Sequence, residues 1–206
     1  WREIVGRHPG QGLACDRLGE LTAAGLLLAA TLKFDGKLVL QIHGDGPVSL
    51  MVVECDASGT FRATVKCRED AAMPASEDLR ALVDVQGKGR FALTLDPRRR
   101  TVGLQPYQGI VPLEGTTVAQ VLERYMARSE QVPTRLWLAA DADRACGLLL
   151  QKLPAEGGTI SPDSQSDVDG WSRMQHLADT LTRAELLAQP ADTILERLFW
   201  NEPANT

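Results

Sequence analysis

An apolar run near the start of the chain sets the expected architecture: residues 21–32 read LTAAGLLLAATL and include no charged side chain. The run continues an amphipathic pattern over residues 11–20, and Pro9-Gly10 before it and Phe34-Asp35-Gly36 after it are typical helix boundaries. The sequence therefore predicts one helix over residues 11–33. A helix that is apolar all round must be covered on every side, so we expect it inside the domain with sheet on both sides of it. The run is shorter than the roughly twenty residues of a membrane span.

Short alternating segments after this helix predict antiparallel strands. They are bounded by turn residues such as Gly44-Asp-Gly-Pro47, and Thr117 opens a further helix with a capping-box pattern. The strand–helix–strand alternation typical of a parallel sheet does not occur. The expected fold class is therefore α+β, with antiparallel sheets packed around a buried central helix, followed by a small helical linker subdomain. The expected strands are residues 37–43, 48–54, 61–67, 90–95, 107–113, 136–140 and 145–153, and the other helices of the first domain are 76–82 and 117–128.

The charge balance argues against two classes of partner. The chain has 206 residues with 22 Lys and Arg against 27 Asp and Glu, a formal net charge of −5. Duplex nucleic acid and anionic membranes both need concentrated positive charge, so we expect neither as a partner. The basic triplet Arg98-Arg99-Arg100 is expected to be a solvated loop. A signal peptide is not visible in the sequence, so a cytoplasmic location is expected.

The cysteines and histidines do not have the spacing of a metal site. Cys15, Cys55, Cys67 and Cys146 form neither C-x-C nor C-x-x-C, so no zinc site or redox dithiol is predicted within this chain. Cys15 and Cys146 lie in apolar contexts and are expected to be buried and unreactive, whereas Cys55 lies at a turn and is expected to be more exposed. The pattern at Gly87-Lys-Gly89 fits a loose dinucleotide motif, but a strand follows it where that motif needs a helix.

The chain divides into three parts by composition. Residues 1–154 carry the predicted strands and the central helix, residues 155–170 form an acidic flexible linker, and residues 171–206 form a helical linker subdomain. The burial of this subdomain's apolar side chains and the entropy of ordering it are of comparable size, so small perturbations could dock or release it. The alternative, which the pattern alone favours, is a stably docked helical subdomain. Its large apolar residues are Trp171, Met174, Leu177, Leu181, Ile194, Leu195, Leu198 and Phe199.

Several strings of sequence, in order along the chain, resemble one known family. They are ATLKFDG at 30–36, GDGP at 44–47, YQGIVPLEG at 107–115, SEQVPTRL at 129–136 and GLLLQKLP at 147–154. Together they are similar to the redox-regulated heat-shock holdases, often called 33-kDa chaperonins. The resemblance implies a core domain with its linker and not an enzyme.

The resemblance also implies a function and a regulation. Members of the family are ATP-independent cytosolic chaperones of the stress response that bind unfolded client proteins during oxidative stress, and active members form homodimers, in some cases by swapping segments. Their C-terminal module binds zinc through a C-x-C and a C-x-x-C, and these cysteines form disulfides when oxidised. The present sequence ends at Thr206, about where that module would begin, and its start is expected to lack the family's first strand. Pro106 stands where a basic residue is expected.

Two other hypotheses remain open beside the holdase. One is a small-molecule enzyme with its site near His43, Asp45 and Glu54; the other is a plain protein-interaction module. An enzyme would have a closed cleft with a perturbed acid or base and an orienting partner. A holdase would instead bind clients through broad apolar surface, and we predict the eight large apolar residues of the C-terminal subdomain as its client-binding residues.

Overall fold

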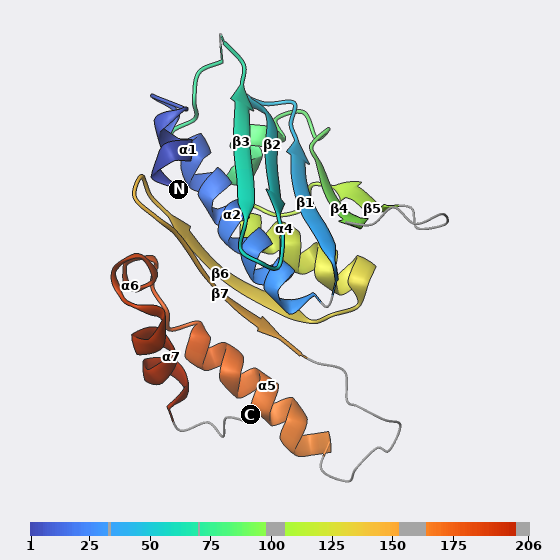
Figure 1. The fold of residues 1–206 in the computed structure, drawn as a ribbon, viewed down its shortest axis with the longest axis vertical. Coiled ribbons are helices and arrows are strands. Elements are labelled where there is room, and N and C mark those ends of the chain that lie inside the picture. The colour runs from blue at the N-terminus through green and yellow to red at the C-terminus, as the bar shows by residue number, and fades with distance from the viewer. Residues whose placement is uncertain (33, 70, 98–105, 153–163, 201–206) are drawn as a thin grey trace.

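The computed structural model describes residues 1–32, 34–69, 71–97, 106–152 and 164–200 (Figure 1). We refer to the described residues up to 152 as the body and to residues 164–200 as the tail. In Figure 1 the tail helices lie beneath the body, beside its two-stranded hairpin. None of the helices in these described ranges combines the length and the apolar character needed to cross a membrane.

A five-stranded antiparallel sheet forms one layer of the body. The inward side chains alternate along each strand, as in β1, where Leu38, Leu40 and Ile42 are buried and Lys37 and His43 are exposed. The antiparallel strands predicted for these segments are therefore confirmed. The strands, in the spatial order β3-β2-β1-β4-β5, are β1 (Gly36–His43), β2 (Val48–Cys55), β3 (Phe61–Cys67), β4 (Arg90–Pro97) and β5 (Tyr107–Pro112).

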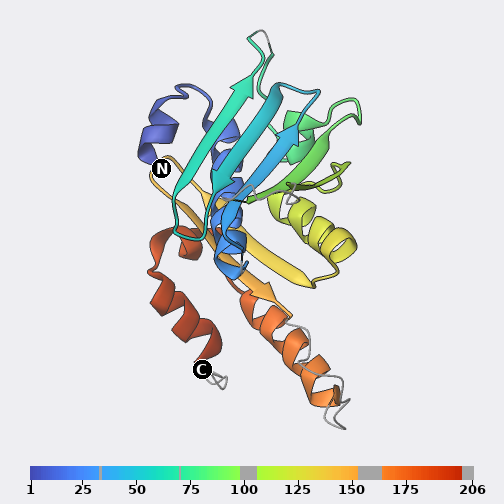
Figure 2. The same ribbon diagram turned by 45° about the vertical axis from the view of Figure 1, so that its right-hand side comes forward.

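The central helix α2 (Gly12–Thr31) runs between this sheet and a second, two-stranded sheet (Figures 1 and 2). The second sheet is the hairpin of β6 (Thr134–Ala140) and β7 (Ala145–Gln151). Leu18 and Leu21 of α2 are fully buried. Both the predicted helix and its cover of sheet on two sides are confirmed.

Shorter helices accompany α2 in the body. They are α1 (Arg2–Gly6), α3 (Leu79–Val83) and α4 (Val118–Tyr125), which continues into a π-helical turn (Met126–Glu130). Helix α4 packs on both α2 and β6. The Thr117 hydroxyl accepts the backbone N–H of Gln120, as its capping pattern predicts. Helix α1 was not predicted from the sequence. The indole Nε1 of Trp1 beside it donates to the Asp141 carbonyl at 2.7 Å and so ties the start of the chain to the β6–β7 turn.

The tail is helical, as expected, but its first helix begins earlier than the sequence indicated. The three helices are α5 (Ser164–Ala178), α6 (Arg183–Ala188) and α7 (Ala191–Phe199). The composition of residues 164–170 predicted a linker, but these residues belong to α5. A polar composition does not itself prevent helix formation. The rest of the predicted linker, and the arginine triplet at 98–100, lie outside the described residues.

Gly19 permits the closest approach between α2 and the hairpin. A Cβ atom on this residue would collide with the Cβ of Ala140 and would lie 2.9 Å from the Trp1 ring. Alanine normally stabilises a helix interior by about 0.5–1 kcal/mol relative to glycine. We expect Gly19→Ala instead to lower the free energy of unfolding by about 1–2 kcal/mol, because overpacking is the larger effect.

Urea unfolding followed by circular dichroism measures this change. The matched control is Gly12→Ala at the first residue of the same helix, where no atom lies within 4 Å of the added Cβ. The control should change stability by less than about 0.5 kcal/mol. A Gly19→Ala protein that is as stable as the parent would contradict the packing described here.

Candidate functional site

The tail carries the eight apolar residues that were predicted as client-binding, and the structure gives them different environments. Those that face the body are buried and the others are partly or largely exposed. The buried ones are Leu181, Ile194 and Leu198, the half-buried ones are Trp171, Met174, Leu177 and Phe199, and Leu195 is 44% exposed.

The buried tail residues form one apolar cluster with the hairpin. Leu181, Ile194 and Leu198 pack with Leu186 of α6 and with Ala139 of β6. Partly buried side chains from both parts surround this cluster. The apolar stripe of the tail is therefore covered by the β6–β7 hairpin. Leu186 was not among the predicted residues, although the capping box at Thr182 marks the start of the helix that contains it.

A cavity that is open to solvent lies between part of α7 and β7. Its volume is about 400 Å³, and apolar side chains of the body and of the tail line it. Because the cavity is open to solvent, part of the apolar surface of α7 and β7 is not covered by the facing element. The lining residues are Leu27, Cys146, Gly147, Leu148, Leu149, Leu186, Gln189, Ala191, Ile194 and Leu195.

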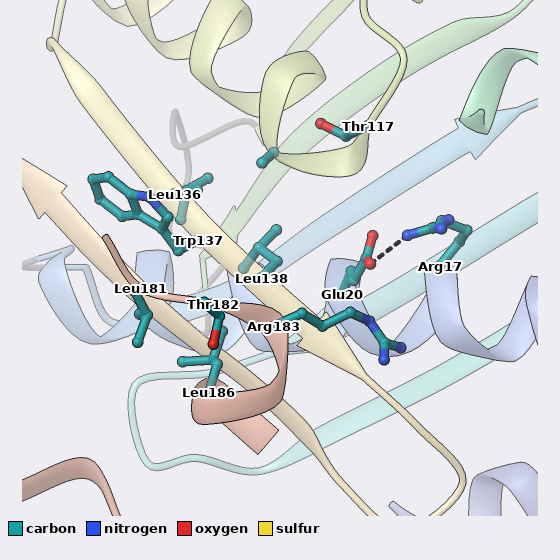
Figure 3. A pocket seen from close by; sticks show the side chains of 11 residues that line it. Arg17, Glu20, Thr117, Leu136, Trp137, Leu138, Leu181, Thr182, Arg183 and Leu186 are labelled. Atoms are coloured by element: carbon teal, nitrogen blue, oxygen red, sulfur yellow. Dashed lines mark hydrogen bonds and ion pairs between the residues drawn. The ribbon is translucent and has the colours of Figure 1, made fainter. Parts of the chain in front are cut away.

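A second cavity of about 240 Å³ lies where α6 meets α2 and the start of α4 (Figure 3). Figure 3 shows Trp137 and Leu138 of β6 on one side of it and Arg17, Glu20 and Arg183 together on the other. The remaining lining residues are Thr117, Ala119, Leu136, Leu181, Thr182 and Leu186. The interface between tail and body thus contains two cavities within the described part of the chain.

The charged side of the second cavity contains a buried ion pair. Arg17 donates from Nη1 to Glu20, and the two residues are only 8% and 5% exposed. Burial raises the pKa of the Glu20 carboxyl, while the guanidinium groups of Arg17 and Arg183 act to lower it. Arg17 Nε is buried without a hydrogen-bond partner. An unpaired buried donor is costly, so this side of the interface is not optimised for stability.

Three arginines make polar contacts between the tail and the body. Arg183 donates to the Ala140 carbonyl, and Arg144 donates to the Leu187 carbonyl at 2.6 Å. Arg135 lies 3.4 Å from the carboxylate of Asp179. The Arg135 and Asp179 side chains are 41% and 48% exposed, so water screens their attraction.

Sequence reasoning missed one exposed aromatic side chain. Trp200, at the C-cap of α7, is 78% exposed, more than any other large apolar residue in the described ranges. It directly follows Phe199, and two adjacent aromatic residues at a helix end would have pointed to it. Trp200 and the 44% exposed Leu195 together leave apolar surface on α7 open to solvent.

The proposed enzyme site near His43, Asp45 and Glu54 does not form. His43 pairs with Leu50 across the sheet, but Glu54 pairs with Val39, four residues farther along β1. The Asp45 carboxylate accepts the backbone N–H groups of Gln86 and Lys88 between α3 and β4, and Glu54 accepts from Lys37 at 2.6 Å. Asp45 and Glu54 therefore bind separate partners, and the three side chains do not meet at a common cleft.

The four cysteines are free thiols, and one expectation about them was wrong. Cys55 is 1% exposed rather than accessible, because its side chain points into the core from the end of β2. Burial, together with the charges of Asp56 and Glu54, raises the pKa of its thiol to about 12. Cys15 is buried as expected, whereas Cys146 is only half-buried.

No group of three or more His, Cys, Asp or Glu side chains within the described ranges could hold a metal ion. Burial raises the pKa of the Cys67 and Cys146 thiols as well, so none of the four is activated as a thiolate.

The difference in burial predicts the order in which the thiols react. With iodoacetamide at mildly alkaline pH, Cys67 and Cys146 should be alkylated at least about tenfold faster than Cys15 and Cys55, because only accessible thiolates react. Peptide mass spectrometry over a time course measures the four rates. In denaturant the rates should become similar. Rapid labelling of Cys55 in the folded protein would be inconsistent with its position in the core.

Comparison with known proteins places these features in a family. The chain matches the model of the Hsp33 protein family over residues 1–206. It is 48% identical over 203 residues to the 33 kDa chaperonin of Methylobacillus flagellatus and 45% identical over 202 residues to that of Chromobacterium violaceum. Each alignment covers 98% of this chain and 64% of the relative, so the chain spans slightly less than two thirds of their length.

A solved structure has the same fold. The crystal structure of the 33 kDa chaperonin (Hsp33 homolog) from Thermotoga maritima aligns with a TM-score of 0.71 at 24% identity, covering 98% of this chain and 69% of that one. The α+β fold predicted from the sequence agrees with this neighbour. On the match of the family model along the whole sequence, the chain belongs to the Hsp33 protein family.

Proposed function

We propose that this chain is the client-binding part of an ATP-independent, redox-regulated chaperone that acts in the cytoplasm under oxidative stress. The names of its relatives, 33 kDa chaperonin, support a role as a chaperone. The observation that carries the holdase mechanism is the interface between tail and body, where an apolar cluster is docked next to cavities of about 400 and 240 Å³. A holdase has no reaction to catalyse; it binds unfolded proteins and keeps them from aggregating.

The proposed mechanism is release of the tail. When α6 and α7 leave the hairpin, Leu186, Ile194 and Leu198 lose their cover, and so does Ala139 on the body. Contiguous apolar surfaces of this kind bind the exposed apolar segments of unfolded proteins. The cavities and the screened ion pairs keep the free energy of docking small, so release needs only a modest perturbation.

We include zinc binding and redox regulation in this proposal because the family resemblance implies them. They would act through a C-terminal module whose C-x-C and C-x-x-C motifs do not occur among Cys15, Cys55, Cys67 and Cys146. Without such a module on it, the 206-residue chain should hold clients in the absence of oxidant. Homodimer formation, by segment swapping as in family members, is part of the same proposal.

Aggregation of a heat-denatured client, followed by light scattering, tests the proposed function. We expect this chain to suppress the aggregation equally with and without peroxide, because the docking of the tail does not depend on a disulfide. The control is the same client kept native, which the chain should not bind. Suppression that requires peroxide, or none under either condition, would count against the proposal, and equal binding of the native client would favour a plain interaction module.

Hydrogen exchange tests the marginal docking separately. Backbone amides of α6 and α7 should exchange at least about a hundredfold faster than those in the centre of α2, because the tail opens without global unfolding. Mass spectrometry of peptides from the exchanged protein measures both regions in one experiment, so α2 serves as the internal control. Equal protection of the tail and α2 would show that the tail is a firmly packed part of the fold.

A further inference from the structure

Helix α6 occupies a surface of the body that combines acidic and apolar groups. Its first residue, Arg183, donates to the Ala140 carbonyl and lies 3.9 Å from the Asp16 carboxylate. Burial raises the pKa of the Asp16 carboxyl, and the Arg183 charge is the largest influence that lowers it. The Arg183 charge also acts on Glu20 and Asp141. The Asp16 carboxylate of the body therefore lies beside the Arg183 guanidinium of the tail, and Glu20 lies on the same side of the cavity as Arg183 (Figure 3).

The apolar part of the same surface receives the residue three positions later. Leu186 is 6% exposed and packs in the cluster with Ala139 of β6. The next carbonyl, of Leu187, accepts from Arg144 in the β6–β7 turn. In a helix, residues three apart lie on one face, so the arginine and the leucine reach the body together. Along α6, the body thus contacts the charge of Arg183, then the apolar side chain of Leu186, and then the backbone carbonyl of Leu187.

We propose that this surface is a client subsite that selects segments with an arginine three residues before a leucine, and that α6 occupies it as an internal substitute for such a segment. The inference rests on the proposed function, because the subsite becomes free only when the tail is released. The occupant is a cationic and apolar stretch of an unfolded polypeptide. A segment with an acidic residue in place of the arginine would be repelled, because Asp16 and Glu20 would face a like charge.

Helix α6 leaves part of this subsite unused. The cavity of about 240 Å³ lies beside Arg183 and Leu186, and Arg17 Nε in its lining has no hydrogen-bond partner. A client segment with a bulkier side chain at this point would fill the cavity. A carbonyl group of the same segment would accept a hydrogen bond from Arg17 Nε. A client can therefore make contacts that α6 does not make, which allows it to compete with a segment tethered to the body.

Other charges around the subsite do not cancel its preference. Arg17 is already paired with Glu20 and also lies 3.6 Å from Glu77. Arg144, from the β6–β7 turn, donates to the Leu187 carbonyl. The Asp141 carboxylate accepts the backbone N–H groups of Asp143 and Arg144, so Asp16 is the carboxylate that attracts a positive charge at the position of Arg183.

Binding of labelled peptides to the 206-residue chain tests the inference. The chain carries Arg183→Ala, so that the guanidinium group of its own tail no longer competes. The probe is the sequence of residues 180–189, TLTRAELLAQ, and fluorescence anisotropy gives its dissociation constant. The control peptide, TLRTAELLAQ, exchanges the arginine with the preceding threonine, so that no leucine stands three residues after the arginine, and it has the same composition and charge. We expect the probe to bind about tenfold more tightly than the control. Equal binding of the two peptides would overturn the inference, and so would no binding of either.

A charge reversal on the body makes the test independent of the tail. Asp16 has a side chain that is 33% exposed, so Asp16→Lys is compatible with folding, which circular dichroism verifies. In this variant, combined with Arg183→Ala, the tenfold preference should fall to about threefold or less, and a peptide with glutamate in place of the arginine should gain affinity. An unchanged preference for the probe over the control would show that Asp16 does not recognise the arginine of the peptide.

The outcomes separate this inference from the proposed function. If the chain suppresses aggregation but does not distinguish the two peptides, the holdase proposal stands and the selective subsite is wrong. If it distinguishes the peptides but does not suppress aggregation, the subsite exists and the holdase proposal is wrong.

Discussion

The burial of α2 (Gly12–Thr31) on both sides is the constraint on which the rest of the structure depends. A helix with leucine and alanine on every face cannot lie at a surface, so the five-stranded sheet covers one side and the β6–β7 hairpin covers the other. The hairpin is only two strands wide. One of its faces packs on α2, and its opposite face remains apolar because Trp137 and Leu148 alternate with the inward side chains. That second face is what the tail covers.

The elements of the body could be predicted from the sequence because periodicity and turn residues are local signals. The burial of Leu38, Leu40 and Ile42 follows directly from their alternation. Helix α1 was missed because it is short and has no buried residue, so it lacks an amphipathic pattern. The exposure of Cys55 was misjudged because a turn position in sequence does not reveal that the strand before it ends with its side chain inward.

The candidate site was only partly predictable. The apolar stripe of the tail is visible at helical spacing, and its residues at 181, 194 and 198 are indeed those that face the body. The cavities, the Arg17–Glu20 pair and the contacts of Arg183 join residues that are far apart in the chain. Such contacts depend on how α2, α4 and α6 are placed relative to one another, and sequence periodicity has no information on that placement.

Two neighbouring carbonyl groups in the β6–β7 turn are bound from opposite ends of the chain. Asp141 accepts the indole of Trp1, and Ala140 accepts the guanidinium of Arg183. Consecutive peptide planes share a Cα atom, so a rotation that suits one acceptor tilts the other. The same turn of the hairpin therefore anchors both the first residue and helix α6, so a change in its backbone would alter both contacts at once.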